Sequence, residues 1–296
     1  MQMLQRLYEL PPKDVVRKIR RRLLSTDRSV FDLEEIASSA KHLRFQRVYD
    51  FLSRYEAIIS RTHPEWQGVQ FKGRRVLEIG CGPLLGWGPM AIFLGADCYV
   101  SAEPFFNENV LNDPTLMERY FLGLHKDLAA IYGPRMLFDE FCEAMRQRVE
   151  IHRQELLVAP IQGLFDVVLS NSCLEHVFPL EATLARLKHV SSPDCCFIHL
   201  VDFGNHRGTR NPFSGIYSVE PEIYLEKFGG EINLARAPDV ERAFREVGFE
   251  FALVPYYEFR EFYDEPINTF WRERYSDEEL FLKTGLIVGP VGQSPA

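Results

Sequence analysis

A strand-like run followed by closely spaced glycines constrains the fold of this chain more than any other stretch. Residues 76–79 are largely apolar and few enough to form a buried strand. Gly80, Gly82 and Gly86 follow, and Pro83 suits the first turn of a helix. A strand, a glycine turn and a helix bring backbone N–H groups close to a ligand, because no Cβ atom obstructs the approach. We therefore expect an α/β protein that binds a ligand at this turn.

Two acidic residues near the glycines favour one type of ligand. Glu78 lies before the first glycine, where its carboxylate would meet a cationic amine rather than a phosphate. The next strand-like run, residues 96–103, ends in Glu103, as a strand that binds a ribose should. One carboxylate that faces an amine and another that faces a ribose describe S-adenosylmethionine better than a dinucleotide.

These segments, together with a third, resemble the class I S-adenosylmethionine-dependent methyltransferases. The similar segments are LEIGCGP at 77–83, Glu103, and FDVVLSNSCLEHV at 165–177, in that order. The resemblance extends from about Arg74 to the end of the C-terminal strand. It implies a doubly wound, Rossmann-like α/β fold with a seven-stranded, mostly parallel sheet whose last strand is antiparallel. It also implies S-adenosylmethionine as cofactor and S-adenosylhomocysteine as product.

The resemblance also implies the residues of the cofactor site. It places the glycines at the methionine part of the cofactor and Glu103 at the ribose hydroxyls. Glu155 occupies the position of an acid that accepts the exocyclic amine of adenine, and Asn171 ends the fourth strand at the edge where ligands gather. The predicted cofactor-binding residues are Glu78, Gly80, Cys81, Gly82, Glu103, Glu155, Leu156, Asn171 and Ser172.

Three residues are candidates for catalysis on a hydroxyl acceptor, which must lose a proton during methyl transfer. His176 in LEHV and Asp202 in LVDF resemble the His–Asp pair of sugar O-methyltransferases, with His176 as general base and Asp202 orienting it. VDFGNH at 201–206 resembles methyltransferases found with bacterial polysaccharide and glycan assembly genes, and it makes His206 a rival base.

These resemblances predict methylation of a hydroxyl on a sugar or glycan-type small molecule. Two alternatives stay open at this point. One is a methyltransferase that acts on a quinone, polyketide or amine, and the other is a catalytically inactive, S-adenosylmethionine-binding regulatory protein. The acceptor and the oligomeric state do not follow from the sequence.

The chain divides into three expected parts. Residues 1–72 form an N-terminal helical extension that covers one side of the cofactor cleft, and residues 73–290 form the methyltransferase domain. Residues 291–296 are expected to be a mobile tail. Within the domain, residues 105–148 are more than a crossover helix needs, and we expect a helical lid near the mouth of the active site.

Composition excludes several other classes. The net charge of −8 disfavours binding to nucleic acid, which requires clustered cations. No apolar run reaches the roughly 18 residues of a membrane span, and no signal-peptide pattern begins the chain, so we expect a cytoplasmic protein. The six cysteines form no CxxC pair, which favours reduced core thiols, and no metal site is predicted.

The segment Lys13–Leu24 has two interpretations. As a helix, it gathers Val15, Val16, Ile19 and Leu23 near one another and leaves basic side chains elsewhere. Such a helix can make a peripheral contact with an anionic membrane, or it can pack on the domain with a solvated basic face. The sequence does not separate the two.

Overall fold

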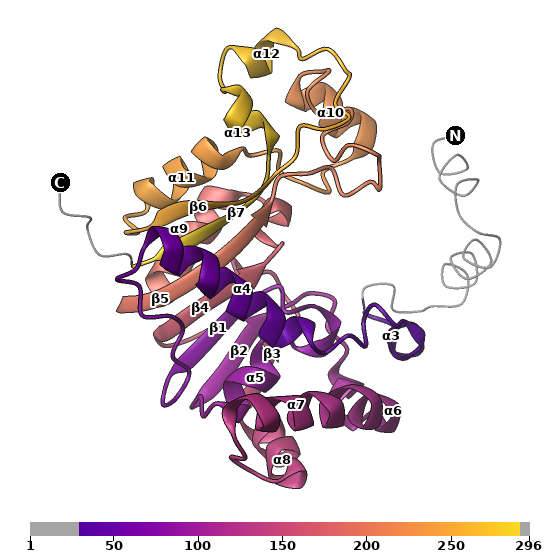
Figure 1. Cartoon of the computed structure of the whole chain (residues 1–296), viewed down its shortest axis with the longest axis vertical. Helices are drawn as coiled ribbons and strands as arrows, with labels where there is room; N and C mark the ends of the chain where they lie inside the picture. The colour runs from indigo at the N-terminus through magenta and orange to yellow at the C-terminus, as the bar shows by residue number, and fades with distance from the viewer. Residues whose placement is uncertain (1–29, 291–296) are drawn as a thin grey trace.

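A seven-stranded sheet forms the centre of the molecule. The computed structural model describes residues 30–290 (Figure 1). The strand order is β3-β2-β1-β4-β5-β7-β6, and all pairs are parallel except β5–β7 and β6–β7. The strands are β1 (Arg75–Ile79), β2 (Cys98–Ala102), β3 (Val149–His152), β4 (Phe165–Asn171), β5 (Ser191–Asp202), β6 (Ala252–Glu258) and β7 (Leu282–Gly289). This confirms the predicted fold class.

Helices cover both faces of the sheet because successive strand residues point to opposite sides. In β1, Val76 belongs to the core on one face and Leu77 to the core on the other, and both are fully buried. The first core includes α4 (Arg47–Thr62), α5 (Gly88–Phe93), α7 (Leu122–Tyr132) and α8 (Phe138–Arg148). The second includes α9 (Leu180–Val190) and α11 (Ala237–Glu246).

The described part of the N-terminal extension is fixed to the sheet by two long-range hydrogen bonds. The short helix α3 (Leu33–Ser38) begins at Asp32, whose carboxylate accepts backbone N–H bonds at 2.9 and 3.2 Å. From α4, the Val48 carbonyl accepts a hydrogen bond from the Trp87 indole at 2.8 Å. The Tyr55 hydroxyl donates to Asn171 at 2.6 Å, so α4 is tied to the end of β4.

Two predictions fall outside the residues that the structure describes. These are the basic segment Lys13–Leu24 and the mobile tail at 291–296. Within residues 30–290, no helix is both long enough and apolar enough to cross a membrane.

The segment 105–148 differs from the helical lid that the sequence predicts. It contains η2 (Glu108–Asn112), α6 (Pro114–Leu116), the π-turn η3 (Met117–Phe121), α7 and α8. The apolar residues of α7 and α8, such as Leu128 and Phe141, are fully buried, and both helices pack against α5. Most of the segment therefore covers a face of the sheet, and only its first part borders the cavities at the carboxyl edge.

A cap stands beyond the carboxyl end of β5, at the top of Figure 1. It contains α10 (Pro221–Phe228), α12 (Thr269–Arg272) and α13 (Asp277–Phe281), around a buried aromatic cluster. Arg236 is almost fully buried there and donates to the Phe203 carbonyl at 2.8 Å and to the Tyr217 hydroxyl at 3.0 Å. These bonds attach the cap to the residue that follows β5.

Candidate functional site

Two adjoining cavities lie at the carboxyl edge of the sheet, where β1 and β4 are neighbours. The chain leaves β1 toward β2 and β3 and then returns to β4, and such a switch in strand order is where α/β sheets bind ligands. We call them the Glu78 cavity and the Glu103 cavity. They share Gly80, Gly82 and Asn171 as lining residues, so they form one continuous cleft.

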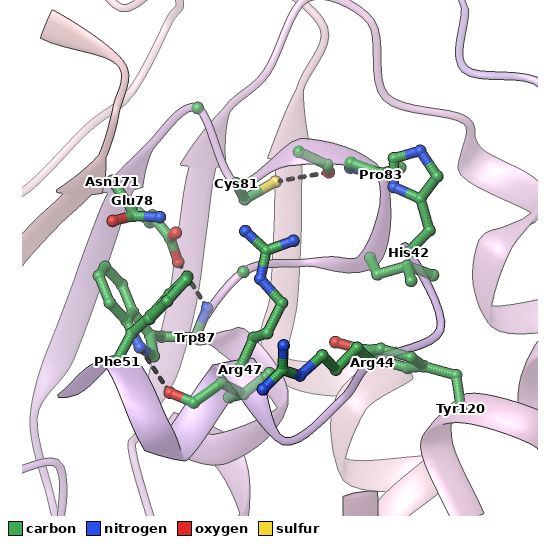
Figure 2. A pocket seen from close by; sticks show the side chains of 15 residues that line it. His42, Arg44, Arg47, Phe51, Glu78, Cys81, Pro83, Trp87, Tyr120 and Asn171 are labelled. Atoms are coloured by element: carbon green, nitrogen blue, oxygen red, sulfur yellow. Dashed lines mark hydrogen bonds between the residues drawn. The ribbon is translucent and has the colours of Figure 1, made fainter. Parts of the chain in front are cut away.

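The Glu78 cavity has a volume of about 230 Å³ and is lined on one side by residues of the N-terminal extension (Figure 2). It is lined by His42, Arg44, Arg47, Val48, Phe51, Glu78, Gly80, Cys81, Gly82, Pro83, Leu84, Gly86, Trp87, Tyr120 and Asn171. The Glu103 cavity has a volume of about 410 Å³. It is lined by Phe31, Ile79, Gly80, Gly82, Ala102, Glu103, Pro104, Phe105, Glu155, Leu156, Asn171, Ser172, Cys173, His176, Val177 and Thr183.

The two glycines that both cavities share serve different purposes. A Cβ atom on Gly80 would lie 2.6 Å from the Cys173 sulfur, so the turn can pass beneath the end of β4 only with glycine there. A Cβ atom on Gly82 would meet no heavy atom within 4 Å, and the residue has φ of +65°. The absent side chain at Gly82 therefore leaves space and an accessible backbone beside the cleft.

Glu78 is held in place by the chain around it. Its Oε2 atom accepts hydrogen bonds from the Trp87 backbone N–H at 2.9 Å and from the Tyr99 hydroxyl at 2.7 Å. The side chain is 1% exposed. Burial raises the pKa of Glu78 to about 7, although these two hydrogen bonds act in the opposite direction. The carboxyl group is thus poised to ionise when a cationic group enters the cavity.

Glu103 is organised in a similar way at the end of β2. Its Oε2 atom accepts from the Gly82 N–H at 2.9 Å, and its Oε1 atom accepts from the Phe105 N–H at 3.1 Å. Burial raises the pKa of this carboxyl group. Each oxygen can still accept one further hydrogen bond, because a carboxylate oxygen has two lone pairs.

The other predicted cofactor residues also line the cleft. Glu155 is exposed at its rim, whereas Leu156 is buried below it. Cys81 is buried in the glycine turn, and burial raises the pKa of its thiol well above the usual range. Asn171 and Ser172 end β4, where Asn171 accepts the hydrogen bond from Tyr55 described above.

Cationic residues of the N-terminal extension line the Glu78 cavity, and the sequence analysis missed them. Figure 2 shows that Arg44 and Arg47 extend toward the same space as Glu78 and Cys81. Among residues 30–290, no carboxylate oxygen lies within 4.0 Å of either guanidinium group. Their spacing gave no signal, because arginines near the start of a helix usually face solvent, and Arg44 lies just before α4 whereas Arg47 begins it.

A cluster of ionisable residues lies beside the Glu103 cavity, at the carboxyl ends of β4 and β5. We call Glu175, His176, Asp202, His206 and Lys283 the histidine cluster. The rings of the two histidines meet edge to face, with centroids 4.9 Å apart. His206 Nε2 lies 3.4 Å from Asp202 Oδ2 and 3.7 Å from Glu175 Oε1. The sequence analysis named three of these five residues.

The structure corrects the predicted pairing of His176 with Asp202. Asp202 contacts His206 and Lys283 instead, whereas His176 Nδ1 is hydrogen-bonded to the backbone carbonyl of Glu231. A carbonyl oxygen only accepts, so Nδ1 carries the hydrogen and Nε2 presents a lone pair. Proximity of the ends of β4 and β5 was predicted, but the conformation of the loops that follow them decides which side chains meet.

The two carboxyl groups of the histidine cluster differ in charge state. Burial tends to raise the pKa of Asp202, but hydrogen bonds from His206 and Lys283 outweigh it and hold that pKa at about 2. Burial raises the pKa of Glu175 to about 8. Burial also lowers the pKa of His176, which keeps its imidazole neutral near pH 7.

Two asparagines fix the segments that carry the histidines. Asn233 donates to the carbonyls of Leu174 and Val177 at 2.8 and 3.2 Å, on either side of the turn η4 (Leu174–His176). Asn205 is 2% exposed and bonds to both Thr209 and Ser214 in the loop after β5. His206 follows it with φ of +52°, a left-handed conformation that few residues other than glycine adopt.

Comparisons with known proteins give a likeness in fold only. No protein-family model and no curated protein matches the chain. A Haloferax volcanii methyltransferase, solved in complex with the Trm112 methyltransferase activator, is 16% identical with a TM-score of 0.45, over 89% of this chain and 99% of that one. An S-adenosylmethionine-dependent methyltransferase from Mesorhizobium loti is 14% identical with a TM-score of 0.44, over 86% and 98%.

A third similar structure has a different named activity. The [4+2]-cyclase SpnF is 13% identical with a TM-score of 0.38, over 68% of this chain and 59% of the cyclase, so the match spans less than two thirds of that protein. A fold does not determine an activity, so the function has to be argued from the site.

Proposed function

We propose that this protein transfers a methyl group from S-adenosylmethionine to a hydroxyl of a sugar or glycan-type small molecule. One observation carries the proposal: two buried carboxyl groups, Glu78 and Glu103, flank the glycine turn in one continuous cleft. The carboxylate of Glu78, beside this turn, would repel the pyrophosphate of a dinucleotide. The two acids suit a ligand with a cationic amine at one end and a ribose at the other.

The cleft has a matching group for each part of this cofactor. Glu78 would accept a hydrogen bond from the ammonium group of the methionine part. Arg47 lies in the same cavity and would bind the carboxylate of the methionine part. Glu103 would accept the ribose hydroxyls through its remaining lone pairs, while Glu155 and Leu156 border the place of the adenine. The cofactor supplies an electrophilic methyl group on a positively charged sulfur.

The histidine cluster favours a hydroxyl acceptor, because such an acceptor must lose a proton. His176 lines the Glu103 cavity, and its Nε2 atom presents the lone pair that a general base needs. The Glu231 carbonyl holds the ring in this tautomer. His206 lies against the same ring, with Asp202 to stabilise any positive charge that it acquires.

Calorimetry with S-adenosylmethionine and with NAD tests the cofactor first. We expect the former to bind and the latter not to bind; the reverse result would remove the basis of the proposal. Formation of S-adenosylhomocysteine is then measured with a simple glycoside, an aliphatic amine and a hydroquinone. Turnover on the glycoside alone is the expected result, and turnover only on the amine would contradict a hydroxyl acceptor.

A further inference from the structure

Three residues of the histidine cluster place one possible metal ligand each around a common point. A carboxylate oxygen of Glu175, a ring nitrogen of His176 and a ring nitrogen of His206 all lie within 4.8 Å of one another. The first two residues belong to η4 and the third to the loop after β5. The sequence predicts no metal site here, because about 30 residues separate the two segments and no short motif joins them.

Glu175 is the member that most needs a partner. Glu175 is 3% exposed, and neither oxygen of its carboxyl group makes a hydrogen bond of normal geometry among residues 30–290, although the nearby backbone N–H groups of Glu175 and Asp202 act to lower its pKa. The nearest cationic candidate, His206 Nε2, is 3.7 Å from Oε1, which is too long for a normal hydrogen bond. A buried carboxyl group without partners is costly, and a bound cation removes that cost.

One of the two histidines, His176, has the surroundings that metal-ligating histidines usually have. Such a ring donates its other N–H group to a carbonyl or carboxylate, which orients the lone pair toward the ion. His176 donates from Nδ1 to the Glu231 carbonyl, so Nε2 is available. His206 Nε2 lies 3.4 Å from Asp202 and 3.7 Å from Glu175, so binding an ion through this atom would replace the hydrogen bond to Asp202 and leave the hydrogen of the ring on Nδ1.

The charge around these atoms also suits a cation. Asp202 lies next to His206, and its own charge is balanced by the ion pair with Lys283. Glu175 is therefore the carboxyl group left to neutralise an ion. Two imidazoles and one carboxylate form a ligand set that first-row divalent metals accept, with coordination positions left open.

We propose that Glu175, His176 and His206 bind one divalent transition-metal ion, such as Mn²⁺ or Zn²⁺, beside the Glu103 cavity. The site rests on the geometry above, whereas the role of the ion rests on the proposed function and changes one step of it. An ion here would bind the acceptor hydroxyl and make it more acidic. The proton leaves to solvent, and the two histidines then serve as ligands rather than as the base.

Calorimetry with the metal ion alone tests the site. Chelator-treated protein is titrated with MnCl₂ and with ZnCl₂, without cofactor or acceptor. We expect one ion per chain for the wild-type protein. Glu175→Gln and His206→Ala should each weaken binding by about 100-fold or more, since even outer-shell partners of a metal ligand change affinity by about 10–100-fold.

The controls separate this site from other histidine–carboxylate contacts. His63 lies 3.3 Å from Glu65 on the surface, so His63→Ala removes a similar pair elsewhere and should leave ion binding unchanged. Thermal unfolding of each variant shows that it is folded, and His206 lies in an exposed loop where substitution is tolerated more easily. Absence of binding up to millimolar ion, or unchanged binding by both cluster variants, overturns the site.

Assays of methyl transfer test the role of the ion separately from the proposed function. If both hold, chelator-treated protein turns over a glycoside about 100-fold more slowly, and added Mn²⁺ or Zn²⁺ restores the rate. Turnover that chelation does not alter overturns the role of the ion and leaves His176 as general base. Specific ion binding without turnover on any acceptor supports the site and contradicts the proposed function.

Discussion

The cofactor cleft and the histidine cluster lie side by side on one edge of the sheet, yet their buried carboxyl groups differ in the hydrogen bonds that they accept from the chain. In the cleft, Glu78 and Glu103 each accept two hydrogen bonds from the chain itself. In the cluster, Glu175 accepts none of normal geometry from the described residues. The carboxyl groups of the cleft are therefore organised by the chain itself, whereas the proposed ion would supply the missing partner of Glu175.

The two sets of carboxyl groups differ because their neighbours come from different parts of the chain. The donors to Glu78 and Glu103 are the backbone of the glycine turn and its neighbours, together with Tyr99 of the adjoining strand. The cluster draws on η4, the end of β5, the loop after it and the start of β7. One region is thus built by local chain geometry and the other by the packing of distant segments.

The largest expected effect comes from His176, the cluster residue that lines the cleft. His176→Ala should lower turnover by about 10²–10⁴-fold, because the ring acts either as the general base or as a ligand of the ion that makes the acceptor more acidic, while cofactor affinity stays unchanged. Steady-state kinetics and calorimetry with S-adenosylmethionine measure the two quantities. His63→Ala is the control and should retain full turnover. Normal turnover in His176→Ala, together with loss in His206→Ala, would transfer the role to His206.

A change at Glu103, on the same edge of the sheet, should have the opposite effect: it should weaken cofactor binding and leave the histidine cluster unaffected. Glu103→Ala removes charge-assisted hydrogen bonds to the ribose, worth about 1.5–3 kcal/mol each, and should weaken cofactor binding by tenfold or more. Ion binding by the histidine cluster should not change. Glu150→Ala on the neighbouring strand removes an exposed carboxylate and serves as control. A loss of less than about tenfold, or an equal loss in both variants, would mean that Glu103 does not bind the cofactor.

The smallest effect concerns the cost of keeping Glu78 buried. Its pKa of about 7 in the folded protein is above the ordinary 4.5, so the folded state binds this proton more tightly than the unfolded state. The resulting stability is fully present below about pH 4.5 and is lost as pH rises through 7, with a slope of at most about 1.4 kcal/mol per unit.

Comparison with a variant isolates that contribution. The free energy of unfolding in urea is measured between pH 4.5 and 8 for the wild-type protein and Glu78→Gln. The stability of the wild type relative to the variant should fall through this range and level off above pH 7. A constant difference would show that Glu78 is ionised in the folded protein well below pH 7.

The contrast between local and distant partners also explains what the sequence could predict. The apolar runs and the glycine turn predicted the first strands, and the resemblance to class I methyltransferases implied the sheet and the cofactor residues, all of which line the cleft. The partner of Asp202 was predicted wrongly, because the conformation of His206 and the approach of Lys283 depend on the cap. Arg47 was missed because its role depends on how α4 packs over β1.

The packing of α4 has a consequence for how the protein is made. Tyr55 on α4 meets Tyr256 on β6, with ring centroids 5.5 Å apart, although about 200 residues separate them in the chain. At a synthesis rate of about 5–20 residues per second, the ribosome adds the partner of this helix roughly 10–40 s after the helix itself. One wall of the cleft is therefore translated early, but its packing against β6 is completed only after nearly the whole domain has been made.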